Sequence, residues 1–321
     1  MTLAVKGGEV EVSVLVPAKD EAENLEEFVR QCRDALAAVP YACEVVIIND
    51  GSEDGSAALL QRLQVEHAFL QVITHRNQRG IADALRSGGD VARGRIFVFY
   101  PADLQFLPAE IPSLVEPVRT READIVTGAK QGSYDKALVS GIYNWICRRL
   151  FGIRVTDLNA VKAYRREVMD VVPARPDWHR FMVVIAAADG YRVTERPVTL
   201  MPRRAGKSKF GIGRIPVGVL DLVSVWFQLR FGRKPMLFFG TSGGLLVALG
   251  VLVGLTAVIL RFGFDLGLRP LLYLVILLVV SGVALFGVGF VGEMVAGARD
   301  ENRQLVRAVE RLASELERRR Q

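Results

Sequence analysis

The chain has 321 residues, of which half are apolar, with a net charge of +6 and a pI near 9.4. This length suits one large domain with an additional segment, and the positive mean hydropathy of +0.25 comes from the part after residue 235. An excess of basic residues is typical of proteins that bind nucleic acid or an anionic membrane. The lack of an RNA-binding signature favours the membrane. The scattered Cys32, Cys43 and Cys147 favour reduced thiols over disulfides or a zinc site.

The first part of the chain alternates strand-like and helix-like segments. Strands are expected at Val12–Pro17, Glu44–Ile48, Leu70–Thr74, Ile96–Tyr100, Asp124–Thr127 and Arg192–Val198. Helices are expected at Glu21–Ala38, Ser56–Gln64, Ile81–Ala92, Ser140–Phe151 and Phe181–Asp189. Repeated strand–helix units predict an α/β fold with a mostly parallel sheet and helices on both of its faces. The apolar run Val12–Val16 is too short for a signal peptide, which predicts that this domain stays in the cytoplasm.

The chain changes character after Gly206. Ile215–Phe231 is apolar except for a polar stripe at helical spacing, formed by Asp221, Ser224 and Gln228. This pattern predicts an amphipathic helix in the membrane interface, and an ordinary core helix is the alternative.

Two uncharged apolar runs follow, Met236–Leu260 and Leu271–Gly292, and each is long enough to cross a bilayer core of about 30 Å. The short connection Arg261–Pro270 predicts a transmembrane hairpin whose outer ends share one side of the membrane. Basic residues flank those outer ends, namely Arg230, Arg233, Lys234, Arg299, Arg303 and Arg307. The connecting loop has only two arginines, so the positive-inside rule predicts a multi-pass protein of the cytoplasmic membrane with both termini in the cytoplasm.

The tail Asp300–Gln321 is strongly charged and helical in character. Its apolar residues recur at four-three-four spacing, at Leu305, Val309, Leu312 and Leu316. This spacing is typical of a short coiled-coil seam and suggests a homo-oligomer, although a solvated helix has the same pattern.

Four polar clusters follow expected strands or precede the membrane segment. They are Pro17–Glu21, Asn49–Gly55, Asp103–Gln105 and Arg203–Gly211. Open α/β sheets bind ligands at the carboxyl ends of their strands, where the first three clusters fall. Taken singly, Asp-Gly-Ser is a common turn and a basic segment before a membrane is often only an electrostatic anchor. Together they indicate carboxylates for a base and ribose, a carboxylate for a metal, and a cationic loop facing the bilayer.

In combination, these motifs resemble those of the family-2 glycosyltransferases of GT-A fold, and more closely the polyprenyl-phosphate glycosyltransferases such as dolichyl-phosphate mannose synthases and bacterial undecaprenyl-phosphate glucosyl and aminoarabinosyl transferases. VPAKDE is similar to the family's VPxxNE, INDGSEDGS to VDDGSxDGT, and PADLQFLPAEIP to DADLQxxPEEIP. GSYDKALVSGIYN, DLNAVKAYRR and RRAGKSKFG complete the resemblance, the last through RxxGxSK. The resemblance implies a Rossmann-like GT-A domain over 1–211, interfacial helices over 212–235, two transmembrane helices within 236–295, and a charged cytoplasmic helix over 296–321.

The resemblance also implies roles for individual residues. Pro17, Asp20, Glu21, Asp50 and Gln105 would bind the nucleotide sugar. Asp103 would bind Mg²⁺ or Mn²⁺ bridging the diphosphate, with Gln105 beside it. Candidates for the acceptor phosphate are Arg203, Lys207, Lys209 and Lys136. Asp103 and Asp157 would be the catalytic residues, and Asp157 would orient the acceptor or act as a weak base, unless it is merely a capping or loop residue.

The implied reaction is inverting transfer of a sugar from a UDP- or GDP-linked donor to a polyprenyl phosphate such as undecaprenyl or dolichyl phosphate. The acceptor phosphate has a second pKa of about 6, so it needs no strong base at neutral pH. Three residues depart from the family pattern: Asp20 replaces Asn, Asn49 replaces the first Asp of DDGS, and Pro101 replaces the first Asp of DxD. The third leaves one carboxylate from that loop for the metal.

Three alternatives compete with this interpretation. A processive polysaccharide synthase would carry QxxRW, which Trp178–Phe181 does not match, and more than two spans. A dinucleotide-binding dehydrogenase would carry GxGxxG after the first strand, where none occurs. A membrane-anchored, inactive GT-A scaffold for a flippase or glycan-assembly partner is favoured by Pro101 and disfavoured by the retained Asp50, Asp103 and basic loop.

Overall fold

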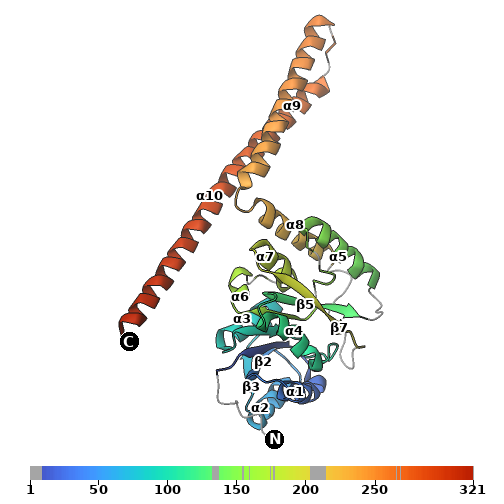
Figure 1. Ribbon diagram of the computed structural model, residues 1–321. Coiled ribbons are helices and arrows are strands. Elements are labelled where there is room, and N and C mark those ends of the chain that lie inside the picture. Colours follow the sequence, from blue (N-terminus) through green and yellow to red (C-terminus); the bar gives the residue numbers. More distant parts are fainter. Residues whose placement is uncertain are drawn as a thin grey trace. The chain divides into compact units, whose positions relative to one another are not determined.

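The computed structural model describes residues 9–131, 137–153, 155–158, 160–173, 175, 178–202, 215–264, 266–267 and 269–320. The chain divides into two compact units, residues 1–222 and 223–321. The first unit holds the sheet and the second holds the long apolar helices (Figure 1).

The described part of the first unit contains a seven-stranded sheet in the order β3-β2-β1-β4-β6-β5-β7. Its strands are β1 (Val12–Ala18), β2 (Cys43–Asp50), β3 (Leu70–His75), β4 (Ile96–Phe99), β5 (Ile125–Gln131), β6 (Lys162–Arg165) and β7 (Val193–Thr199). β1 to β4 are mutually parallel, β5 is parallel to β7, and β6 runs antiparallel between β4 and β5. The predicted mostly parallel α/β sheet is therefore confirmed.

Helices cover both faces of this sheet (Figure 1). The helices of this unit are α1 (Ala22–Ala37), α2 (Ser56–Glu66), α3 (Ile81–Val91), α4 (Ile111–Arg119), α5 (Ala137–Phe151), α6 (Val168–Val171) and α7 (Met182–Ala188), with 3-10 turns η1 (Pro108–Glu110) and η2 (Trp178–Phe181). Side chains alternate along each strand, so Val14 faces α1 and α4 while its neighbour Leu15 faces α3. Fully buried valines and isoleucines fill both layers, as expected for strands covered on both faces.

The sequence analysis missed β6. This four-residue strand begins with Lys162 and ends with Arg165, so its polar composition hides it from a search for apolar runs. It forms because β4 and β5 would otherwise leave unpaired edges on either side of it. Its presence brings Lys162 opposite Phe99, next to the loop that follows β4.

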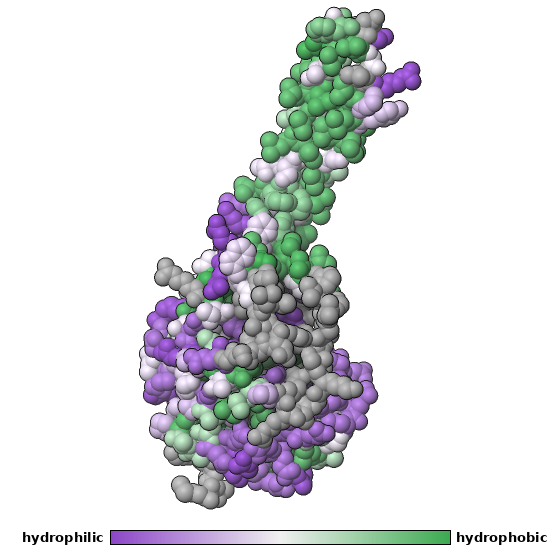
Figure 2. Space-filling model, turned by 90° about the vertical axis from the view of Figure 1, so that its right-hand side faces the viewer, coloured by the Kyte–Doolittle hydropathy of each residue, from purple (hydrophilic) through white to green (hydrophobic). Residues whose placement is uncertain are grey.

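Three helices follow the sheet: α8 (Ile215–Phe231), α9 (Pro235–Gly263) and α10 (Arg269–Arg320). The range of α8 agrees with the helix expected there, and its placement in a membrane interface stays a prediction. α9 and the first part of α10, through Asn302, are long and apolar enough to cross a membrane by length and composition. Figure 2 shows an almost continuous hydrophobic surface along these helices, whereas the face of the first unit is mostly hydrophilic or mixed. A surface of this kind is stable in lipid and costly in water.

Small residues let α9 and α10 approach closely. A Cβ added at Gly243 would lie 2.5 Å from the carbonyl oxygen of Gly282, so both positions require glycine for this packing. At the open end of the hairpin the Met236 N–H donates to Glu293 Oε2 at 3.2 Å, which gives a partner to one of the N–H groups that the first turn of α9 leaves without a helical acceptor. α10 continues without a break to Arg320, so the expected second span and charged tail form one helix.

Candidate active site

The loops that follow β1, β2, β3 and β4 gather at one edge of the sheet because these strands are parallel. In the pairing register Ala18 lies opposite Asn49, and Asp50 lies opposite His75. Tyr100, directly after β4, donates its N–H to the Leu15 carbonyl over 3.1 Å. The predicted clusters at Pro17–Glu21, Asn49–Gly55 and Asp103–Gln105 therefore share this carboxyl edge.

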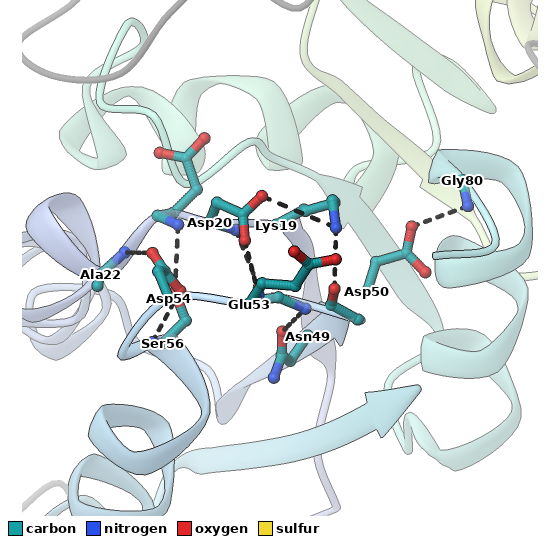
Figure 3. A network of polar contacts seen from close by, with 12 residues as sticks. Lys19, Asp20, Ala22, Asn49, Asp50, Glu53, Asp54, Ser56 and Gly80 are labelled. Carbon is teal, nitrogen blue, oxygen red and sulfur yellow. Dashed lines mark hydrogen bonds and ion pairs between the residues drawn. The ribbon is translucent and has the colours of Figure 1, made fainter. Parts of the chain in front are cut away.

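Hydrogen bonds join the loop after β1 to the loop after β2 (Figure 3). Asp20 donates its N–H to Ser52 Oγ and accepts the Glu53 N–H at Oδ1, and both donor–acceptor distances are 2.9 Å. Lys19 Nζ donates to the Gly51 carbonyl over 2.9 Å, and Asp54 Oδ2 accepts the Ala22 N–H over 3.1 Å. These bonds cross between two strand ends, so the loops form one rigid platform with Asp20 exposed on it.

Asn49 explains one departure from the family pattern. Its side chain is buried, and its Oδ1 accepts the Ser52 N–H over 3.1 Å (Figure 3). This bond closes the turn that starts the second loop, and a carboxylate oxygen would accept it equally well. The replacement of Asp by Asn thus keeps the acceptor that the turn needs.

Asp50 anchors the loop after β3. Its Oδ1 accepts from His75 Nδ1 and from the Arg79 N–H, and its Oδ2 accepts the Gly80 N–H, each over 2.8 Å. Burial opposes ionisation, but the bonds from His75 and the two N–H groups outweigh it and lower the pKa of Asp50. Asp50 is therefore a carboxylate whose bonds hold the ends of β2 and β3 and the loop after β3 together, and its expected contact with the base or ribose stays a prediction.

His75 is a site residue that the sequence analysis missed. Its Nε2 lies 3.0 Å from Ser87 Oγ of α3, while Nδ1 binds Asp50, so the ring is held from both sides. The pairing of β2 with β3 places His75 opposite Asp50, since each residue ends its strand. The contact could therefore be inferred only once this strand pairing was known.

Gly51 allows the second and third loops to touch. Its φ is +68°, and a Cβ there would lie 2.7 Å from the backbone of Asn77 and Gln78. Any other residue would meet both the left-handed strain and the neighbouring backbone.

The Asp103 loop is the second part of the site. Asp103 and Gln105 are half-buried, and Asp103 Oδ1 accepts the Gln105 N–H over 3.2 Å. Between them Leu104 is buried with φ of +55°, a conformation that is costly for a residue with a Cβ. The Gln105 carbonyl accepts the Met201 N–H over 2.8 Å, which anchors the loop. Such strain is common where a loop must hold functional side chains in one direction.

Asp157 lies in a buried, charged environment at the ends of β5 and β6. Its Oδ2 is 3.0 Å from Lys130 Nζ, and its carbonyl accepts from Thr127 Oγ1 over 3.0 Å. The fully buried Lys162 interacts electrostatically with it. Asp157 is thus held by contacts to the sheet, and its catalytic role stays a prediction.

The predicted acceptor-phosphate residues Arg203, Lys207, Lys209 and Lys136 lie outside the described residues. Their roles stay predictions from the sequence.

Comparison with known proteins identifies the family. The model for "Glycosyl transferase family 2" matches residues 13–160. A dodecaprenyl-phosphate galacturonate synthase from Rhizobium johnstonii is 31% identical over 297 residues, which is 89% of this chain and 88% of the relative. The chain belongs to the polyprenyl-phosphate glycosyltransferases of family 2. An undecaprenyl-phosphate 4-deoxy-4-formamido-L-arabinose transferase from Pseudomonas fluorescens is 30% identical to this glycosyltransferase over 291 residues. The aligned part is 88% of this chain and 83% of the relative.

Solved structures support the GT-A fold of this glycosyltransferase. Glucosyl-3-phosphoglycerate synthase from Mycobacterium tuberculosis, in a complex with Mn²⁺, UDP and glucosyl-3-phosphoglycerate, superposes with a TM-score of 0.53. The identity is 18%, and the superposition covers 70% of this chain and 81% of the other. The same enzyme bound to Mn²⁺, UDP-glucose and phosphoglyceric acid gives a TM-score of 0.54 at 17% identity, again over 70% of this chain and 81% of the other. The predicted fold and enzyme class of this glycosyltransferase are confirmed.

Proposed function

We propose that this glycosyltransferase moves a sugar from a nucleoside-diphosphate sugar to a polyprenyl phosphate at the cytoplasmic face of a membrane, with inversion at the anomeric carbon. The observation that carries the proposal is the gathering of Asp20, Asp50 and Asp103 on loops at the same carboxyl edge of the sheet, where hydrogen bonds join the loops of Asp20 and Asp50 to their neighbours. Ligands of open α/β sheets bind at this edge. Both named relatives transfer sugars to polyprenyl phosphates.

The Asp103 loop fits a divalent cation whose coordination the substrate completes. Among the described residues, no cluster of three or more His, Cys, Asp or Glu could hold a metal by itself. Mg²⁺ is often bound by one or two carboxylates together with substrate phosphates, so Asp103 and the Gln105 amide oxygen form a suitable protein contribution. Pro101 then removes one ligand without removing the site. A cation held there would neutralise negative charge on the departing diphosphate.

The chain's own residues would position the two substrates. The rigid platform around Asp20 and Asp50 supports the nucleotide, with Pro17 and Glu21 at its border. Asp157, fixed by Lys130, orients the acceptor or accepts a proton from it. Because the acceptor phosphate is largely ionised at neutral pH, orientation contributes more than base strength.

Membrane association follows from the two apolar helices and the membrane-linked relatives. We further propose the hairpin topology of the sequence analysis, with the enzyme domain 1–211 and both termini in the cytoplasm. The basic segment 203–211 would then face the headgroups, where Arg203, Lys207, Lys209 and Lys136 bind the lipid phosphate.

A panel of radiolabelled UDP- and GDP-sugars with undecaprenyl phosphate tests this function in membranes carrying the enzyme. Transfer of one sugar to the lipid is expected, and it should require Mg²⁺ or Mn²⁺. Calorimetry with the same nucleotide sugars separates an enzyme from a scaffold, because a scaffold would show no metal-dependent donor binding. Absence of both transfer and donor binding would contradict the proposal.

The double variant Lys207→Ala with Lys209→Ala tests the acceptor assignment. It removes two cations that would contact the lipid phosphate, so the acceptor KM should rise by about tenfold or more while the donor KM changes less. Steady-state kinetics with each substrate varied in turn measures the difference. Equal changes in both KM values would mean that the loop is only a membrane anchor.

A further inference from the structure

Lys162 is a fully buried lysine at the edge of the sheet that carries the proposed site. It lies opposite Phe99 of β4 and opposite Thr127 of β5 in the pairing register, and its relative exposure is 0%. Phe99 is the last residue of β4, and the loop with Asp103 follows directly. Lys162 is therefore out of contact with solvent and lies beside the strand end from which the Asp103 loop begins.

The charge of Lys162 is poorly compensated. An ammonium group has three N–H donors, and among the described residues Nζ has one hydrogen-bond acceptor, the Ala160 carbonyl at 2.7 Å. The Phe99 ring lies 5.6 Å from Nζ and adds a weak attraction. Asp157 attracts Lys162, but its carboxylate already pairs with Lys130 at 3.0 Å.

Among the described residues, the histidine near Lys162 adds no negative charge. His179 of η2 packs its ring against Phe99 with centroids 6.1 Å apart, and its pKa falls to about 3 through burial, Lys162 and Arg180. His179 is therefore neutral at physiological pH, while Arg180 adds a further cation beside it. Of the carboxylates in the described part of the chain, Asp157 is the one that interacts electrostatically with Lys162. A buried ammonium group with one hydrogen-bond acceptor is stabilised further by an anionic ligand nearby.

We propose that Lys162 is a proton-linked positioning residue of the transfer site, which takes up a proton from solvent when the anionic nucleotide binds at the neighbouring edge. The proposal rests on the proposed function. Once protonated, Nζ holds the Ala160 carbonyl more strongly and thereby fixes the segment that carries Asp157. Lys162 acts through Asp157 and does not contact the substrate.

The direction of the proton transfer follows from the pKa of Lys162. Burial lowers this pKa to about 7, Asp157 opposes the shift, and Lys130 adds to it. Near pH 8 most Lys162 side chains are thus neutral, and a nearby diphosphate favours the ammonium form. Near pH 5.5 the side chain is already charged, so binding takes up no proton there.

Isothermal calorimetry of the full chain in detergent, with UDP and separately GDP in the presence of Mn²⁺, measures this uptake. Buffers of different ionisation enthalpy give the number of protons exchanged. We expect an uptake approaching about one proton near pH 8 that vanishes near pH 5.5, and an apparent Kd that rises by up to about tenfold per pH unit above 7.

The variant Lys162→Met isolates the responsible group, because methionine fills a similar volume without a charge. It should still bind the nucleotide. The nucleotide's own ionisation contributes equally to the proton uptake of Lys162→Met and of the unmodified protein. The difference in uptake between the two proteins therefore measures the contribution of Lys162, which should be absent in the variant. Lys130→Met is the matched control. It removes the cation that lowers the pKa of Lys162, so uptake should persist at a reduced level near pH 8.

Equal proton uptake by Lys162→Met and the unmodified protein would overturn the inference. If Lys162→Met does not fold, the pH dependence of proton uptake by the unmodified protein tests the inference by itself. Uptake that is the same near pH 8 and near pH 5.5 would also overturn it. Failure of the unmodified protein to bind either nucleotide would overturn the proposed function and this inference together, whereas binding without uptake would overturn the inference alone.

Discussion

The two edges of the sheet use carboxylates in different ways. At the amino-terminal edge, Glu44 is 1% exposed and accepts from Ser13 Oγ over 2.7 Å, from the Arg93 N–H over 2.6 Å and from the Arg93 guanidinium over 2.8 Å. At the same edge, Asp124 accepts from the backbone N–H of Arg192 over 2.9 Å and pairs with Arg165 at 3.3 Å. Each of these acids binds an arginine and the backbone where strands begin.

At the carboxyl edge, the acids instead hold loops and lysines. Asp20, Asp50 and Asp54 accept N–H groups from neighbouring loops, while Asp157 pairs with Lys130. An acid that fixes strand starts contributes to folding, whereas an acid that fixes loops shapes a surface for a ligand. Burial alone therefore does not identify a functional carboxylate, because the partners of a carboxylate decide its role.

The largest expected effect is that of Asp103→Asn on catalysis. Loss of the proposed metal-binding charge should lower transfer by at least about 10³-fold, because charge stabilisation at the diphosphate is lost. The Tm should change little, since the Asp103 side chain is half-buried and asparagine keeps the oxygen that accepts the Gln105 N–H. Turnover measured beside thermal unfolding checks both, and near-normal turnover would remove the metal assignment.

The complementary change at the other edge is Glu44→Ala. It leaves Ser13 and Arg93 without their acceptor, so the free energy of unfolding should fall by about 3 kcal/mol. Activity per folded molecule should not change. Chemical unfolding in detergent measures the loss, with Glu11→Ala as control because the Glu11–Arg95 pair is more exposed and is expected to contribute less than about 1 kcal/mol. A loss of catalysis at full stability would contradict the conclusion that Glu44 contributes to folding and not to the site.

Gly51→Ala tests whether the joined loops form the nucleotide surface. The added Cβ meets the backbone of Asn77 and Gln78 and must shift that loop, so nucleotide Kd should rise by about tenfold and stability should fall by about 2 kcal/mol. Gly190→Ala is the matched control, because Gly190 has φ of +95° with nothing within 4 Å of an added Cβ. It should cost stability without changing nucleotide affinity, and similar affinities for both variants would argue against the platform.

The smallest expected effect is a change in how strongly Tm falls at acidic pH. The pKa of Asp124 is lowered because the bonds from Arg192 and Arg165 outweigh the opposing effect of burial. A group of this kind stabilises the fold above its unfolded pKa of about 3.9, and the contribution is lost as pH falls through the lower folded value. Asp124→Asn should therefore flatten the fall of Tm between about pH 5 and pH 3. An unchanged slope would mean that other carboxylates, such as Asp50 with its similarly lowered pKa, dominate acid unfolding.

Much of the fold was predictable from local patterns. The apolar runs around Val14, Ile47 and Val98 and the amphipathic segment after Glu21 predicted strands and a helix close to their observed bounds. The strand β6 was not predictable, because Lys162–Arg165 becomes a strand only through pairing with two neighbours. Within the site, Asp50 and Asp103 were recognisable from their motifs, whereas the partnership of Asp50 with His75 depended on strand register.

The family, the alternation of strands and helices, the apolar hairpin segments and the strand-end motifs were recognisable from local sequence, because these properties depend on neighbouring residues. The folded structure was needed to see which acids hold loops, which hold strand starts, and why Lys162 is buried beside the end of β4. Those outcomes depend on contacts between residues far apart in the chain, where strand order and burial set the partners of each charge.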